Sequence, residues 1–114
     1  MGIEVRPFPR AEWSATPAEG ASGVESRALL QEETLFVAQL RFSENATIHE
    51  HPSPNEIAVL CLEGEGLTSV GGETSAIRAG EQAHWPPNVP HRLWTEGTPM
   101  LTLMIERPRQ ATGE

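Results

Sequence analysis

The sequence predicts an all-β fold, a sandwich or barrel of short strands, and three features carry this prediction. Most of the chain consists of short apolar or alternating runs separated by turn residues, which is the pattern of half-buried strands. Ten prolines interrupt it, and proline is confined to strand ends, edges and loops because it lacks a backbone donor. No segment has a convincing amphipathic helical pattern, although residues 19–33 leave a helix open as an alternative to strand pairing.

The chain is expected to form one domain, residues 1–114, because its length suffices for one core but not two. We divide it into an N-terminal strand and arm (1–24), a core (25–106) and a tail (107–114). Residues 11–24 are rich in Ala, Ser and Gly and are expected to form a loop or loosely ordered arm. Gly71-Gly72 predicts a hairpin turn. The expected strands are 3–6, 25–30, 34–42, 47–51, 56–62, 66–70, 73–78, 83–85, 91–95 and 100–106.

Charge and composition exclude several classes of function. Eight basic and 16 acidic residues give a formal charge of -8, which argues against nucleic acid or an anionic membrane as a partner. Every basic residue is Arg and every acidic residue is Glu, and Lys, Asp and Tyr are absent. A Schiff-base lysine, an Asp-containing triad and a tyrosine general acid are therefore impossible.

The single cysteine and the N-terminal segment indicate where the protein works. Cys61 cannot form an intramolecular disulfide, and in an apolar run it is expected to be a buried small hydrophobe. Residues 1–10 carry charges and two prolines where a signal peptide needs an apolar segment, and no run approaches the ~20 apolar residues of a membrane span. We therefore expect a cytoplasmic protein.

Three histidines and one glutamate form the most informative pattern. His49 and His51 are two residues apart in a predicted strand and should project from one face. Glu56 follows a short turn that contains proline, and His91 follows a second, stiffer proline turn. Three imidazoles and one carboxylate are the donors of a mononuclear metal site, and such a set suits Fe, Mn, Co, Ni, Cu or Zn.

Two motifs built from these residues resemble those of the cupin superfamily, in particular its small single-domain proteins of the cupin 2, conserved β-barrel type. The first motif corresponds to His49-Glu50-His51, Glu56 and Gly64, and the second to Gly80, Pro86, Asn88, His91 and Thr95. The resemblance implies a small double-stranded β-helix (jelly-roll) barrel. It also implies that His49, His51, Glu56 and His91 bind one divalent metal inside that barrel.

The sequence departs from the family pattern at three positions. Seven residues separate Glu56 from Gly64 where six are usual, which predicts a bulge or a shifted turn. Asn88 replaces a turn glycine, and Asn tolerates positive φ better than most residues. Thr95 replaces an Asn that is not a ligand. All four expected metal-binding side chains are retained.

These expectations lead to two hypotheses about function. The first is a metal-dependent enzyme, of dioxygenase, isomerase or lyase type, that acts on a small polar or anionic molecule at an open position on the metal. His84 and Glu50 are candidate acid–base groups, with a surface or supporting role as the alternative for His84. The second hypothesis is a non-catalytic module that binds or stores a small molecule. The resemblance to short cupins also implies a homodimer.

The sequence does not decide which face of the strand at residues 34–42 points into the barrel. In residues 34–42, Phe36, Ala38, Leu40 and Phe42 share one face, and Leu35, Val37, Gln39 and Arg41 share the other. If the first set fills the barrel, Leu35 and Val37 point to a subunit interface. If the second set does, Gln39 and Arg41 become contacts for a substrate. Met100, Thr102 and Met104 alternate along the last strand and are expected to form one wall of a cavity.

Overall fold

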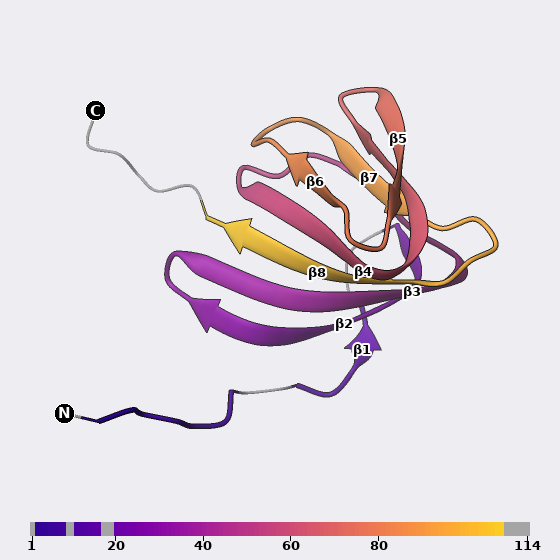
Figure 1. Ribbon diagram of the computed structural model, residues 1–114. Helices are drawn as coiled ribbons and strands as arrows, with labels where there is room; N and C mark the ends of the chain where they lie inside the picture. The colour runs from indigo at the N-terminus through magenta and orange to yellow at the C-terminus, as the bar shows by residue number, and fades with distance from the viewer. Residues whose placement is uncertain (1, 9–10, 17–19, 109–114) are drawn as a thin grey trace, which may run out of the picture.

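The computed structural model describes residues 2–8, 11–16 and 20–108, without the side chains of Glu50 and His51 (Figure 1). The regular structure of these residues is entirely β-strand, in antiparallel pairs. The strands are β1 (Ser14–Ala15), β2 (Ala21–Glu32), β3 (Leu35–His51), β4 (Glu56–Val70), β5 (Glu73–Arg78), β6 (Gln82–Trp85), β7 (His91–Trp94) and β8 (Met100–Arg107). The predicted all-β class is confirmed, and no described helix is long and apolar enough to cross a membrane.

Two long strands, β3 and β4, close the barrel. The first half of β3 pairs with β8 and its second half with β7. The first half of β4 likewise pairs with β8 and its second half with β7. Each long strand replaces two shorter expected strands, because its backbone stays extended while its ladder partner changes. Thr95 supports the change in β3, since its Oγ1 accepts a hydrogen bond from Ala46 N (2.9 Å) and donates one to the Ser43 carbonyl (2.6 Å).

The N-terminal expectations need correction. Residues 2–8 form no strand, so the strand expected at 3–6 is wrong; Ile3 and Val5 are 91% and 85% exposed and have no ladder beside them. The arm expected at 11–24 contains β1, and β2 begins at Ala21. β1 and the first residues of β2 are extended because they pair with neighbouring strands. β1 pairs with β2, and the start of β2 pairs with β3. At the other end β8 runs to Arg107, one residue past the expected core.

Three local predictions about the backbone are confirmed. Gly71 and Gly72 have φ values of 58° and 90° and connect β4 to β5 in a two-residue hairpin. Asn88 has a φ of 64°, as expected of a residue in place of a turn glycine. The extra residue between Glu56 and Gly64 is accommodated by a register shift between Cys61 and Glu63.

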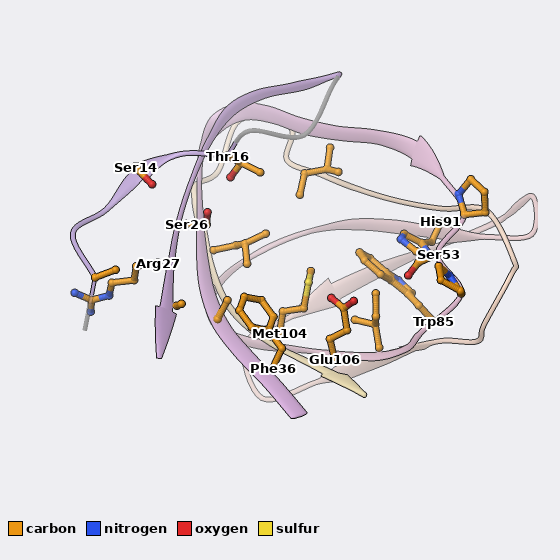
Figure 2. Close-up of a pocket in the computed structure, with 18 of the residues that line it drawn as sticks. Ser14, Thr16, Ser26, Arg27, Phe36, Ser53, Trp85, His91, Met104 and Glu106 are labelled. Carbon is orange, nitrogen blue, oxygen red and sulfur yellow. The ribbon is translucent and has the colours of Figure 1, made fainter. Parts of the chain in front are cut away.

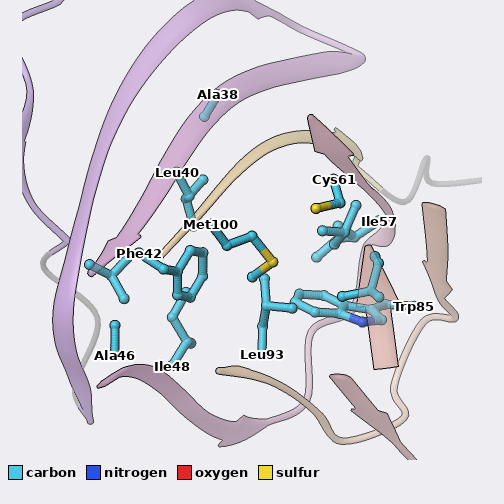
Figure 3. Close-up of a cluster of buried hydrophobic side chains, with 13 residues drawn as sticks. Ala38, Leu40, Phe42, Ala46, Ile48, Ile57, Cys61, Trp85, Leu93 and Met100 are labelled. Carbon is cyan, nitrogen blue, oxygen red and sulfur yellow. The ribbon is translucent and has the colours of Figure 1, made fainter. Parts of the chain in front are cut away.

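The barrel interior is a mainly aliphatic core to which all the long strands contribute (Figure 3). From β3, Ala38, Leu40 and Phe42 are buried, so it is the face with these residues that fills the barrel. Met100 and Thr102 of β8 are buried opposite them, and Met104 packs against the core. The larger buried apolar side chains are Leu40, Phe42, Ile48, Ile57, Val59, Ile77, Trp85, Leu93 and Met100.

Candidate functional site

A cavity of about 690 Å³ enters the barrel beside the N-terminal arm (Figure 2). Its walls are largely apolar. They come from β3, β4, β6 and β8 and consist of Phe36, Ala38, Leu40, Ile48, Ile57, Trp85 and Met104. His91, Trp85 and Ser53 lie at one end of the cavity, and Ser14, Ser26 and Arg27 lie at the other (Figure 2). The volume is within the range of small-molecule sites, about 300–1,000 Å³.

His91 reaches the cavity lining from the first position of β7. It is 1% exposed, and its ring stacks on the Trp85 indole with 4.0 Å between ring centroids and 12° between planes. Trp85 is fixed in turn, because its Nε1 donates a hydrogen bond to Thr68 Oγ1 (2.9 Å). The Thr68 hydroxyl donates to the carbonyl of Arg92 (2.9 Å), the residue that follows His91. These contacts set the plane of the imidazole before any ligand enters.

The remaining polar groups of the cavity lie on its loop and on β8. Asn55 holds the loop in shape, with its backbone N–H donating to Ser53 Oγ (3.2 Å) and its side-chain amide donating to Glu106. The backbone N–H of Asn88 donates to the Ser53 carbonyl (2.6 Å), which ties this loop to the proline turn before β7. Ser53 and Glu106 both line the cavity. A ligand would therefore meet a few placed polar groups within an apolar site.

The arm closes one side of the cavity and is held by Trp13. The Arg27 and Arg41 guanidinium carbons lie 4.5 and 4.2 Å from the centroid of the Trp13 ring. Arg27 Nε donates to Gln39 Oε1 and Arg41 Nε to Glu25 Oε1, each at 2.8 Å, so both cations are held in place. Ala11, Glu12, Ser14 and Thr16 of the arm line the cavity. This contact of Trp13 with two arginines sets the position of one cavity wall.

The four expected metal ligands do not share one side of the sheet. His91 faces the interior, but His49 is exposed and lines a groove on the outer face together with Arg92 and Trp94. Glu56 is also on the outer face, where its Oε2 lies 2.8 Å from His84 Nε2. The reason is strand alternation, because the neighbours Ile48 and Ile57 are buried. His51 is the backbone partner of His91, and its side chain is outside the described residues.

The described side chains therefore do not form the expected shell of three histidines and one glutamate. Among them no group of three or more His, Cys or Glu residues is placed to hold a metal ion. The metal site stays a prediction. The candidate acid–base group His84 is 59% exposed and does not line the cavity, and the side chain of Glu50, the other candidate, is outside the described residues.

Sequence reasoning missed Thr68 and Arg92. Thr68 looks like any strand threonine, and only the folded barrel brings its hydroxyl to Trp85, which is 17 residues away in the chain. The sequence could have indicated Arg92, since it stands between His91 and Leu93 and strand alternation places it on the opposite face.

Cys61 is buried as expected, and burial raises the pKa of its thiol.

Comparison with known proteins agrees with the observed architecture. A search of curated proteins finds no match. Among solved structures, SPY1581 of Streptococcus pyogenes, a protein of unknown function, is 24% identical with a TM-score of 0.71, over 77% of this chain and 76% of that one. The polyketide cyclase RemF of Streptomyces resistomycificus is 19% identical with a TM-score of 0.77, over 99% and 89%. KdgF of Halomonas sp. is 15% identical with a TM-score of 0.78, over 94% and 96%.

These likenesses of low identity concern the fold, and the family follows from the sequence itself. The family model Cupin_2, described as the cupin domain, matches residues 39–106. The matched segment contains β4 to β7 and most of β3 and β8, which together form the closed barrel and supply His91. The chain belongs to the cupin family.

Proposed function

We propose that this cupin is an enzyme that acts on a small organic molecule held in the barrel cavity, with His91 as the group that moves a proton. The observation that carries the proposal is a nearly fully buried imidazole on the lining of a cavity whose other walls are largely apolar. A buried titratable group that lines a cavity is typical of catalytic sites. The stacked Trp85 supports this role because it fixes the ring plane.

The lining favours a substrate with an apolar body and one polar group. Phe36, Leu40, Ile57 and Met104 offer contact to hydrocarbon, and burying apolar surface stabilises a complex by about 25 cal/mol per Å². The polar group would lie next to His91, where the imidazole can accept or donate a proton. This substrate is less polar than the one expected from the sequence.

Proton transfer by an imidazole serves two of the expected reaction types directly. Isomerisation and elimination next to a carbonyl both begin with removal of a proton from carbon, which a positioned imidazole accelerates by about 10²–10⁴-fold. RemF, a polyketide cyclase, shows that a barrel of similar fold can act on a small molecule. The likeness supports only the capacity of the fold, because one fold hosts many functions.

The expected divalent metal is tested separately from this proposal. His49 and Glu56 lie on the outer face, away from His91. The proton transfer proposed for the His91 imidazole therefore does not involve a metal bound by these two residues. Elemental analysis of protein purified without chelators or nickel resin measures the bound metal. About one equivalent of one transition metal would support a mononuclear metal site in this protein.

The experiment for the proposed activity is exchange of carbon-bound protons in D₂O, followed by NMR, against a panel of aromatic and aliphatic ketones, keto acids and lactones. His91→Gln is expected to abolish exchange while it keeps the shape of the site. His84→Gln is the matched control, since it removes an outer-face imidazole, and it is expected to leave exchange unchanged. If panel members raise the melting temperature but none is turned over, the non-catalytic binding module replaces the enzyme.

We also propose a homodimer. Ile3, Val5 and Phe8 are 91%, 85% and 55% exposed, and Leu35 and Val37 are only half-buried on the outer face of β3. These apolar side chains would be covered by a second copy of the chain. Sedimentation equilibrium is expected to give twice the chain mass, and a single-chain mass at high concentration would contradict the dimer.

A further inference from the structure

A second polar site lies on the outer face of the barrel, on the other side of the sheet from the cavity. It is a shallow groove of about 690 Å³ lined by His49, Ser69, Gly72, Thr74, Arg92 and Trp94. The register places Ser69 opposite both Arg92 of β7 and Thr74 of β5. Residues paired in this way share a face, so the guanidinium and the two hydroxyls form a row across three neighbouring strands. None of these lining residues is acidic.

Arg92 is held in one orientation at the centre of this row. Its Nε donates a hydrogen bond to Thr47 Oγ1 (3.3 Å), and its guanidinium carbon lies 4.1 Å from the centroid of the Trp94 ring. Trp94 is fixed as well, because its Nε1 donates to Glu96 Oε2 (3.3 Å). A guanidinium that is stacked and bonded through Nε keeps both terminal nitrogens available as a planar fork.

The surrounding charge makes this fork unusual. The chain has 16 acidic and eight basic residues, and Arg6 and Arg41 form ion pairs with Glu4 and Glu25. Among the described side chains, which exclude those of Glu50 and His51, Arg92 has no ion-pair partner, and its side-chain hydrogen bond goes to Thr47. An arginine fork binds carboxylate or phosphate groups through two parallel hydrogen bonds. No carboxylate of the described side chains pairs with this guanidinium.

We propose that the outer groove binds a small oxyanion, a carboxylate or phosphate group, with Arg92 as the main contact and the hydroxyls of Ser69 and Thr74 as additional donors. The site is distinct from the cavity, since Arg92 and His91 point to opposite faces of β7. It does not depend on the reaction proposed for His91 and can fail or succeed independently of it.

The test is a titration of ¹⁵N-labelled protein with sodium phosphate and, separately, with sodium acetate, at pH 7.5 and constant ionic strength set with sodium chloride. Saturable amide shifts are expected at Ser69, Thr74 and Arg92. Arg92→Gln is expected to weaken binding at least about tenfold, because a hydrogen bond to a charged group is lost. Arg92→Lys should bind with intermediate strength, since it keeps the charge but loses the fork. The two titrations show whether phosphate or carboxylate is preferred.

Arg78→Gln is the matched control, because it removes the same charge from an exposed position of the neighbouring strand β5. It is expected to leave phosphate binding unchanged. Equal binding by wild type and Arg92→Gln, or shifts that follow sodium chloride alone, would overturn the proposal. If Arg92→Gln does not fold, Thr74→Ala at an exposed position gives the second test and should weaken phosphate binding while Arg92 stays in place.

Discussion

Thr68→Val removes the hydrogen bond that holds Trp85 against His91 and should destabilise the barrel measurably. Valine matches threonine in shape, so the change leaves packing nearly intact and removes one hydroxyl. That hydroxyl accepts from Trp85 Nε1 and donates to the Arg92 carbonyl. Thr68 and Trp85 are 6% and 1% exposed, so water cannot replace the lost partner. The variant therefore leaves a buried indole N–H without an acceptor.

The expected loss of unfolding free energy is about 2 kcal/mol, since an unsatisfied buried donor costs about 1–3 kcal/mol. For a domain of this size each kcal/mol corresponds to about 4 °C, so the melting temperature should fall by about 8 °C. Thr74→Val makes the same chemical change at an exposed position of β5 and should cost less than about 0.5 kcal/mol. Urea and thermal unfolding followed by circular dichroism measure both variants.

A double-mutant cycle isolates the bond itself. Trp85→Phe removes the indole N–H, so adding Thr68→Val to that background leaves no orphaned indole donor. The double variant should be at least about 1 kcal/mol more stable than the sum of the two single effects predicts. Additive effects, or a cost below about 0.5 kcal/mol for Thr68→Val alone, would refute the reasoning that this hydroxyl fixes Trp85.

Three further predictions concern the metal, the arm and the thiol. His51→Ala is expected to abolish metal binding while the barrel stays folded, and stoichiometric metal in the purified variant would contradict this. Trp13→Ala loses its contacts with two arginines, worth about 0.5–1 kcal/mol each, so hydrogen exchange should accelerate in residues 11–16 and not in β4; unchanged exchange argues against the arm contact. Burial raises the pKa of Cys61, so the unfolded thiol ionises before the folded one. The contribution of Cys61 to the free energy of unfolding should be fully present below the ordinary thiol pKa. Above it, the free energy of unfolding should decline by up to about 1.4 kcal/mol per pH unit. Cys61→Ala should show a flatter decline between pH 8 and 10 in urea titrations, and equal slopes would refute this origin.

Much of the barrel could be predicted because its local signals are strong. The hairpin follows from the backbone freedom of Gly71 and Gly72, and the bulge near Leu62 follows from the extra residue relative to the cupin motif that the chain resembles. The strand at 3–6 was wrong for the opposite reason. Its alternation of Ile3 and Val5 with charged residues satisfies the strand pattern, but a strand needs a ladder partner, and partners are decided by tertiary structure.

The direction of the His-x-His pair illustrates a deeper limit. Two residues that are two positions apart on a strand share one face of the sheet. The spacing does not say which face this is, because a register shift of one residue turns both side chains to the other face. Where the strand is regular, the apolar neighbours decide which face each side chain points to. Burying Ile48 and Ile57 contributes about 1.5–3 kcal/mol each, whereas turning His49 or Glu56 inward instead would bury a polar group at a cost.

The β3–β7 ladder contains a register shift beside the His-x-His pair, where this parity changes. Between Ile48, which pairs with Leu93, and His51, which pairs with His91, β3 advances three residues while β7 advances two. That extra residue brings the His51 backbone opposite His91 and leaves His49 on the outer face. The register shift thus falls within the His-x-His motif. The outer groove and the cavity lie on opposite sides of the same sheet, with His49 and Arg92 lining the groove and His91 lining the cavity, because alternation along β7 points Arg92 and His91 to opposite faces.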